Sequence, residues 1–343
     1  MEEFKTPTSK RFRSWFDVDN LSPLKIPATP FLKQIGYGCG VNVFTLERSP
    51  KVGFARSPWA IKKRNANLSK DIKYDLRIKF EADILRNLNH PNIVGFRALT
   101  LSATGIPCLA MEKLDQSLGD LIEERVDTEQ DPFKAEDIEF VGYEIAKGLD
   151  YLHHTVNILH GDLKSYNVLV SNNMKTIKIC DFGVSVPIDK NMVMNDGFIY
   201  TGTECWNAPE VISEEGPITN KTDMWAYGLI LWEMIALSPP HVDTGEELSE
   251  SILNNTMDSV IDDENTNPNN SELLDSSLFQ DIKVNENLGT RPALPAISIG
   301  PEYDHILEIF TLCTDQDYKT RPSARGVVMY FQNSIFKPSG GSK

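Results

Sequence analysis

Two short polar motifs in the middle of the chain constrain its fold more than any other feature. The first is His-Gly-Asp-Leu-Lys-Ser-Tyr-Asn at residues 160–167, and the second is Asp-Phe-Gly at residues 181–183. Each motif follows an apolar run, so both are expected on loops. Their co-occurrence in this order, with Asp162 and Asp181 separated by 19 positions, is rare by chance.

The residue types in these motifs point to phosphate chemistry. Magnesium prefers oxygen ligands and keeps several waters, so the Asn167 amide and the Asp181 carboxylate suit one such ion. Asp162 lies five residues before Asn167, a spacing that allows it to reach a substrate hydroxyl. Lys164 is placed to steady a transferring phosphoryl group.

A glycine-rich stretch, residues 35–43, has the sequence Ile-Gly-Tyr-Gly-Cys-Gly-Val-Asn-Val. Glycine lets backbone N–H groups approach phosphate oxygens closely. The pattern is not a regular G-x-G-x-x-G, because Val41 occupies the third glycine position and Gly40 comes one place early. Taken alone, the stretch is equally consistent with an ordinary tight hairpin.

Two further residues gain meaning only in combination. Lys62 ends the apolar run Trp59–Lys62, and Glu81 follows 19 residues later in a helical pattern. A phosphate-binding lysine needs a carboxylate to hold its ammonium group in place. Separately, each residue reads more simply as a solvated surface charge.

The periodicity of apolar residues divides the chain into two parts. Short β-type runs dominate between residues 31 and 111, at 41–46, 59–62, 93–98 and 108–111. One amphipathic helix interrupts them, with an apolar face formed by Leu76, Phe80, Ile84, Leu85 and Leu88. After residue 118 the pattern is mostly helical, including residues 140–152 and a fully apolar helix at 224–237. These patterns predict an α+β fold with two unlike lobes, about 31–111 and 117–336, joined near residues 111–116.

Composition excludes several classes of protein. The net charge of −15 argues against a nucleic-acid-binding face. The apolar stretch at 224–237 is too short to span a membrane, and the N-terminus lacks the apolar segment of a signal peptide. Five dispersed cysteines indicate free thiols in a reducing compartment. We therefore expect a cytoplasmic or nuclear protein.

Three segments are expected outside the packed core. Residues 1–30 contain Thr6-Pro7 and Ser22-Pro23, which suit a proline-directed kinase and make Thr6 and Ser22 candidate phosphorylation sites. Residues 243–288 contain twelve Asp or Glu and one Lys, which indicates a solvated insertion or an acidic docking surface. Residues 337–343 form a short tail. Its Gly-Gly-Ser-Lys end lacks the apolar terminal residue of a PDZ ligand, so we do not expect PDZ binding.

These motifs together resemble those of the eukaryotic protein kinases. Ala208-Pro209-Glu210, Asp223-Met224-Trp225 and Arg321-Pro322 extend the resemblance over about nine-tenths of the chain. It implies the two-lobed kinase fold, with Arg321 paired to Glu210 in a buried, structural contact.

The resemblance also implies a role for each site residue. Asp162 would be the catalytic aspartate and Lys164 its partner, with Asn167 and Asp181 as magnesium ligands. Lys62 and Glu81 would form an ion pair, and Thr203 would contact Asp162 and Lys164. The implied cofactors are ATP and Mg²⁺. The residues implied to surround ATP are Ile35, Gly36, Tyr37, Gly38, Cys39, Gly40, Val41, Asn42, Val43, Lys62, Glu81, the gatekeeper Met111, and Glu112 and Leu114 of the adenine-binding hinge.

Further residues indicate which class of protein kinase the chain resembles. Leu163-Lys164 and Gly202-Thr203 match the serine/threonine kinase pattern. Further matches, among them Phe4–Pro7 and Leu288–Pro292, resemble the T-LAK cell-originated protein kinases, a family similar to the MAP kinase kinases. This resemblance implies a mitotic serine/threonine or dual-specificity kinase. Its expected partners are a stress-activated MAP kinase as substrate and a cyclin-dependent kinase acting on Thr6.

Two residues depart from the kinase pattern. Gly161 replaces the arginine that binds an activation-loop phosphate, so we expect activity without phosphate on that loop. Trp206 replaces a tyrosine two residues before Ala208. A pseudokinase or scaffold acting through the acidic insertion and the tail is the alternative function. The complete set Lys62, Glu81, Asp162, Asn167 and Asp181 argues against it, because pseudokinases usually lack at least one of these residues.

Overall fold

The computed structural model describes residues 21–22, 26, 32–38, 40–51, 54–65, 72–241 and 287–334. They fall into two units, of which one is β-rich and the other mostly helical, and this confirms the predicted α+β fold. The first unit contains the described residues up to Leu88 together with Gly95–Lys113. The second contains Asn89–Val94 and the described residues from Leu114 onward.

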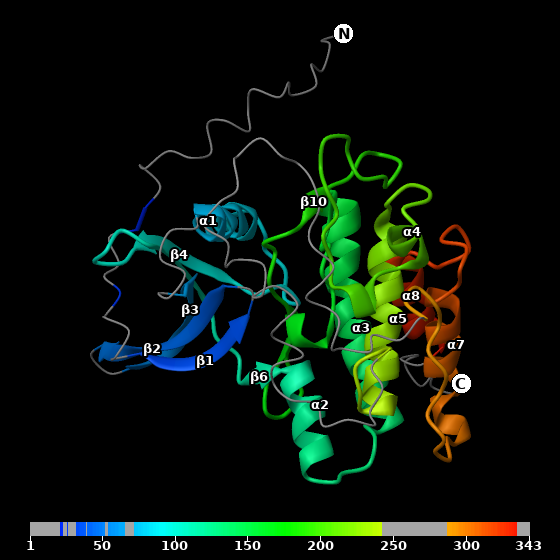
Figure 1. Cartoon of the computed structure of the whole chain (residues 1–343). Helices are drawn as coiled ribbons and strands as arrows, with labels where there is room; N and C mark the ends of the chain where they lie inside the picture. Colours follow the sequence, from blue (N-terminus) through cyan, green and yellow to red (C-terminus); the bar gives the residue numbers. More distant parts are fainter. Residues whose placement is uncertain are drawn as a thin grey trace, which may run out of the picture. The chain divides into compact units, whose positions relative to one another are not determined.

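An antiparallel five-stranded sheet forms the first unit (Figure 1). The strands lie in the order β1 (Lys33–Gly38), β2 (Val41–Lys51), β3 (Phe54–Arg64), β5 (Pro107–Glu112) and β4 (Phe96–Leu101). The predicted runs at 41–46, 59–62 and 108–111 lie within β2, β3 and β5. The run at 93–98 overlaps only the start of β4.

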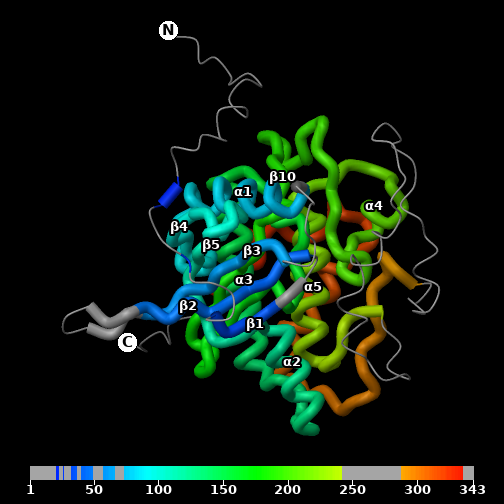
Figure 2. Tube along the Cα trace, turned by 60° about the vertical axis from the view of Figure 1, so that its left-hand side comes forward, coloured from blue at the N-terminus to red at the C-terminus, as the bar shows by residue number. Residues whose placement is uncertain are grey.

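Among the described residues of this unit one helix forms, α1 (Ile72–Arg86), and it packs against β3, β4 and β5 (Figure 2). Its buried face carries Tyr74, Ile78, Glu81, Ala82 and Leu85. The prediction of Leu76 on the apolar face was wrong, because that side chain is 45% exposed. Leu76 lies two residues after Tyr74, about 200° around the helix, and therefore points away from the sheet.

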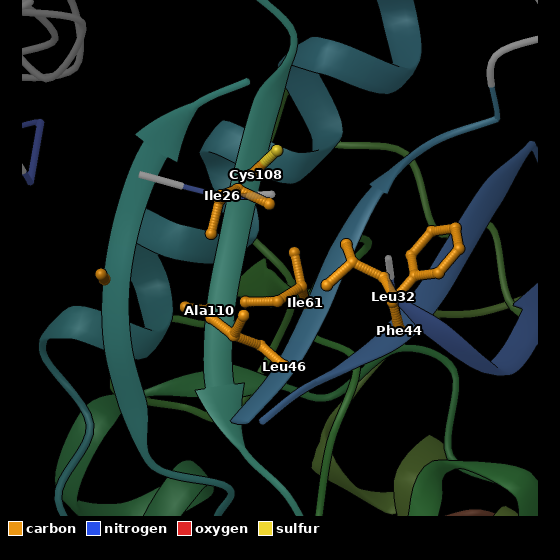
Figure 3. Packing of buried hydrophobic residues seen from close by; sticks show 8 residues of the cluster. Ile26, Leu32, Phe44, Leu46, Ile61, Cys108 and Ala110 are labelled. Carbon is orange, nitrogen blue, oxygen red and sulfur yellow. The ribbon is translucent and has the colours of Figure 1, made fainter. Parts of the chain in front are cut away.

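A hydrophobic cluster anchors the sheet (Figure 3). Its members are Ile26, Leu32, Phe44, Leu46, Ile61, Ala98, Cys108 and Ala110. The chain reaches this cluster before residue 31, within the segment expected as a tail. The Ser22 backbone N–H donates to the Leu99 carbonyl at 2.8 Å, and the Ser22 carbonyl accepts from Thr100 Oγ1 at 3.1 Å. Ser22 therefore pairs with the outer edge of β4.

Helices dominate the second unit. They are α2 (Leu118–Asp127), α3 (Ala135–Tyr151), α4 (Pro209–Ile212), α5 (Asn220–Ala236), α7 (Asp304–Cys313) and α8 (Ala324–Ser334). The helical pattern predicted at residues 140–152 lies almost wholly in α3, on which Val141, Ile145 and Leu149 have no exposed surface. Helix α5 is buried on all sides, as predicted, and packs against α3 and α7.

Short strands in the second unit pair with one another and so connect its loops. A three-stranded sheet joins β6 (Gln116–Ser117), β8 (Val168–Val170) and β9 (Ile177–Ile179), and β7 (Ile158–Leu159) pairs with β10 (Val186–Pro187). The segment 89–94 also belongs here, because the Val94 N–H donates to the Ile179 carbonyl at 2.9 Å. The first unit is therefore not the continuous lobe 31–111 that we predicted.

Several predicted features lie outside the described residues. These include Thr6, the tail at 337–343 and nearly all of the acidic insertion at 243–288. Within the described part of the chain, no helix has the length and apolar character needed to cross a membrane.

The Arg321–Glu210 pair predicted from the motifs is present and buried. Two guanidinium nitrogens of Arg321 each lie 2.8 Å from a Glu210 carboxylate oxygen. The Arg321 guanidinium also lies over the Trp225 ring, 5.0 Å from its centroid. This bidentate pair connects α4 to the segment before α8. Its loss leaves a charge inside the protein with no counter-ion.

We expect Arg321→Ala to lower the free energy of unfolding by about 3–5 kcal/mol, because Glu210 is left buried and unpaired. Chemical denaturation measures this change. Arg325→Ala is the matched control: Arg325 pairs with Asp150 at 3.1 Å, but its side chain is 55% exposed. The control should cost less than about 1 kcal/mol. Equal losses in the two variants would contradict a structural role for the buried pair.

Candidate functional site

The first unit presents a buried lysine–glutamate pair. Lys62 lies on β3, where the sheet register places it opposite Val43 of β2 and Leu109 of β5. Its Nζ lies 2.9 Å from Oε2 of Glu81 on α1, and the two side chains are 9% and 1% exposed. The predicted ion pair is thus formed, and it joins the sheet to the helix.

The predicted glycine-rich stretch forms the β1–β2 hairpin. Ile35, Gly36, Tyr37 and Gly38 lie on β1, and Val41, Asn42 and Val43 begin β2. Gly38 pairs with Val41, so the hairpin turns through only two residues. Gly40 belongs to this turn, and Cys39 lies outside the described residues.

The predicted gatekeeper and hinge begin at the end of β5. Met111 is buried on that strand, and the next residue, Glu112, forms hydrogen bonds through both its backbone and its side chain. The Glu112 N–H donates to the Gly95 carbonyl at 2.8 Å, and its Oε2 accepts from the Gly95 N–H at 3.1 Å. Leu114 belongs to the second unit.

In the second unit, three predicted residues form one hydrogen-bonded group. Thr203 Oγ1 donates to Asp162 Oδ1 at 2.5 Å, and Lys164 Nζ donates to Thr203 Oγ1 at 2.7 Å. Lys164 Nζ also lies 3.2 Å from Asp162 Oδ2. The predicted contacts of Thr203 are therefore confirmed, and a positive charge lies beside the Asp162 carboxylate.

Asn167 and Asp181, the predicted metal ligands, are brought together by the backbone. The Cys180 N–H donates to the Asn167 carbonyl at 2.9 Å, which places Asn167 next to the residue before Asp181. Asn167 Nδ2 donates to Oδ2 of Asp162 at 3.1 Å, so its amide oxygen is directed away from that carboxylate. Asp181 has a φ of +63°, a left-handed conformation that is strained for aspartate and typical of functional positions.

This donor set fits a hard divalent cation that takes most of its ligands from phosphate and water. One carboxylate and one amide oxygen are the protein ligands that Mg²⁺ usually accepts beside phosphates. Among the residues that the structure describes, no group of three or more His, Cys, Asp or Glu side chains forms a closed metal site.

A buried carboxylate with no role implied by the motifs fixes the loop at residues 160–167, called the catalytic loop below. Asp223 of α5 accepts hydrogen bonds from the backbone N–H groups of His160 at 2.9 Å and Gly161 at 3.1 Å. Its Oδ2 also lies 2.8 Å from Nε2 of His153. Burial alone would raise the pKa of Asp223, but the hydrogen bonds and the neighbouring histidines hold that pKa below its ordinary value. The loop before Asp162 is thus bound to the buried helix.

A second carboxylate of α5, Glu233, braces the same loop from another side. Its Oε1 accepts from Ser165 Oγ at 2.7 Å, and its Oε2 accepts from Trp206 Nε1 at 2.9 Å. Burial raises the pKa of Glu233 to about 7, although both hydrogen bonds act to lower it. Trp206, noted as a departure from the kinase pattern, therefore links the segment after Thr203 to α5. An acid inside an otherwise apolar helix was the sequence signal for this contact.

The backbone conformation accounts for glycine at position 161. Gly161 has a φ of +82°, and an added Cβ would lie 2.9 Å from the Val184 carbonyl oxygen. Any side chain there would be strained.

The loop after Asp181 packs through apolar side chains. Leu159, Val186 and Ile188 form a buried cluster, and Met192, Met194, Phe198 and Ile218 pack against it. Backbone bonds add to this packing, including Met194 N–H to the Ile218 carbonyl at 2.8 Å. The loop is therefore ordered without an arginine–phosphate contact at residue 161.

Comparison with known proteins agrees with this geometry. The protein kinase domain family matches residues 31–330. The human lymphokine-activated killer T-cell-originated protein kinase is 41% identical over 339 residues, covering 98% of this chain and 99% of that protein. The resemblance to that family is thus confirmed over nearly the full length.

Two other relatives match a smaller region. Mitogen-activated protein kinase kinase kinase 13-A of Xenopus laevis is 37% identical over 54% of this chain and 17% of its own length. The probable serine/threonine-protein kinase drkC of Dictyostelium discoideum is 31% identical over 67% of this chain and 29% of its own length. The family match, the near-complete human relative and the Asp162–Lys164–Thr203 group together show that the chain belongs to the protein kinase family and is a protein kinase.

Proposed function

We propose that this kinase is a MAP kinase kinase-like enzyme that transfers the γ-phosphoryl group of Mg-ATP to serine or threonine of a stress-activated MAP kinase. The observation that supports transfer to a hydroxyl group is the contact between Asp162 and Thr203 at 2.5 Å. The Asp162 carboxylate already accepts a hydrogen bond from an aliphatic hydroxyl at this position. A substrate hydroxyl requires the same interaction before it attacks phosphorus.

Each residue of the group has a distinct task in this proposal. Asp162 orients the substrate hydroxyl and accepts its proton late in the transfer. Lys164, 3.2 Å from the Asp162 carboxylate, offsets negative charge on the transferring group. Lys62, held by Glu81, binds ATP phosphates. Asn167 and Asp181 hold Mg²⁺, which when bound would neutralise charge on the phosphate oxygens.

The pseudokinase or scaffold alternative finds less support. The ion pair of Lys62 and Glu81 is formed, and Asp162 and Asn167 are hydrogen-bonded to each other. A chain that had lost catalysis would have no need to keep both arrangements intact. The acidic insertion, on which the scaffold hypothesis depends, lies almost wholly outside the described residues.

The cellular setting is also part of the proposal. We propose a mitotic kinase of the cytoplasm or nucleus, with Thr6 and Ser22 as acceptors for a cyclin-dependent kinase. The two sites differ in setting. The Ser22 backbone is hydrogen-bonded to Leu99 at the edge of β4, so a kinase that binds an extended peptide must first break this contact, whereas Thr6 lies outside the described residues.

We expect Lys62→Met or Asp181→Asn to abolish phosphoryl transfer while the protein stays folded. The first change removes the ammonium group that pairs with Glu81, and the second removes a metal-binding charge. Transfer of labelled phosphate to a generic basic protein measures the loss, and thermal unfolding confirms the fold. Retention of most of the rate by either variant would show that its role is assigned wrongly.

We also expect activity without phosphate on the loop after Asp181. The hydroxyl residues between Gly183 and Thr203 are Ser185, Tyr200 and Thr201. Ser185 is buried and donates to the His160 carbonyl at 2.8 Å, whereas Thr201 is exposed. Phosphatase-treated protein and Thr201→Val should keep their rate within about twofold, because apolar packing already orders the loop. A strict loss of activity after loop dephosphorylation would contradict this expectation.

The substrate class is tested with an inactive MAP kinase as acceptor. Wild-type chain is compared with Asp162→Asn, with and without prior treatment by a cyclin-dependent kinase, and with Thr6→Ala as the control for the tail. The proposal is supported if the wild-type chain, but not Asp162→Asn, labels the threonine of the MAP kinase. Label on the tyrosine of the MAP kinase would show dual specificity as well. Label on the generic basic protein but not on the MAP kinase would exclude the MAP kinase kinase-like function.

A further inference from the structure

The turn of the glycine-rich hairpin makes an unusually close contact with α1. Gly40 has a φ of +73°, the left-handed conformation that glycine adopts easily. A Cβ atom added to Gly40 would overlap Cζ and Cε1 of the Tyr74 ring. A side chain at position 40 would therefore meet both an unfavourable backbone conformation and an aromatic ring.

Tyr74 lies on the face of α1 that also carries Glu81. The two residues are seven positions apart, about two helical turns, and Ile78 lies between them on the same face. Tyr74 is 8% exposed, Ile78 is 1% exposed and Glu81 is 1% exposed. One side of the helix thus contacts the hairpin turn at its beginning and Lys62 two turns later.

The end of β3 strengthens this contact. The Asn65 N–H donates to the Gly40 carbonyl at 2.9 Å, so the turn is held by backbone as well as by the ring. Arg64, which pairs with Val41 in the sheet, places its Nε 3.0 Å from Oδ1 of Asp75. Asp75 of α1, next to Tyr74, is therefore paired with Arg64 at the end of β3.

We propose that Tyr74 is a positioning residue for ATP: its ring fixes the glycine-rich turn against the same helix face that holds Glu81 to Lys62. The inference rests on the proposed role of the hairpin in binding phosphate. A two-residue turn with glycine samples many conformations unless something restricts it. Fixing it before ATP arrives lowers the entropy lost on binding, and this effect appears as affinity for nucleotide.

The contact also couples two groups that act on phosphate. A shift of α1 that separates Glu81 from Lys62 moves the Tyr74 ring away from Gly40, because both side chains extend from one rigid helix. ATP bound under an ordered turn therefore favours the helix position in which the ion pair is formed.

The test is a double-mutant cycle on Gly40 and Tyr74. Gly40→Ala displaces the ring with a methyl group, and Tyr74→Ser removes the ring. We expect each to weaken Mg-ATP binding about tenfold by calorimetry and to raise the KM for ATP more than it lowers kcat. The double variant should be no weaker than the worse single variant, because the serine leaves room for the methyl group.

Two variants separate positioning from a merely structural role. Gly105→Ala introduces the same backbone strain, since Gly105 has a φ of +80°, but nothing lies within 4 Å of its added Cβ. It should leave ATP affinity unchanged even if it lowers stability. Tyr74→Phe keeps the ring atoms that face Gly40 and should bind ATP within about twofold of wild type.

Specific results would overturn the inference. If Gly40→Ala and Tyr74→Ser bind Mg-ATP as tightly as wild type, Tyr74 does not position the turn, while the proposed kinase function stands. Multiplicative losses in the double variant would show that the two residues act independently. If wild-type chain transfers phosphate but Gly105→Ala weakens ATP binding as much as Gly40→Ala, strain alone explains the effect. If wild-type chain binds no ATP, the inference fails together with the proposed role of the hairpin.

Discussion

The buried carboxylate of Asp223 is the interaction on which the catalytic geometry depends. It binds two consecutive backbone N–H groups, at His160 and Gly161, from within the fully buried helix α5. Peptide groups that are bound by a buried charge cannot rotate freely. The direction of the backbone is therefore fixed at the residue before Asp162. Once Asp162 is fixed, Thr203, Lys164 and Asn167 can each form a hydrogen bond with it. The position of the loop is therefore set mainly by its hydrogen bonds to α5.

Much of this arrangement was predictable from the sequence because it is encoded in local patterns. Short β-type runs identified most strands of the sheet, the helical spacing of apolar residues identified α1, and a run that is apolar on all sides identified α5. The resemblance of the motifs to those of protein kinases implied that Lys62 pairs with Glu81 and Arg321 with Glu210, and both ion pairs are present. These predictions succeed because each relies on residue types whose burial or charge permits few alternatives.

The remainder depended on tertiary contacts that no local pattern encodes. Leu76 fits the apolar periodicity of α1, yet the sheet contacts the neighbouring face of the helix. Residues 89–94 were assigned to the first unit by their order in the chain, but they bond to β9. The displaced glycine at position 40 was visible as an anomaly. The ring of Tyr74, which a side chain at position 40 would displace, lies 34 positions away in the sequence, and spacing could not reveal this contact.

Protonation of Glu233 affects its hydrogen bonds to Ser165 and Trp206 in different ways. Because burial raises the pKa of Glu233 to about 7, both protonation states are present near neutral pH. Trp206 can only donate, and it uses Oε2, whereas the Ser165 hydroxyl can donate to Oε1 or accept from it. A proton added at Oε1 therefore reverses one hydrogen bond and breaks neither. Serine at position 165 thus allows the catalytic loop to stay attached to α5 whether the buried acid is charged or neutral.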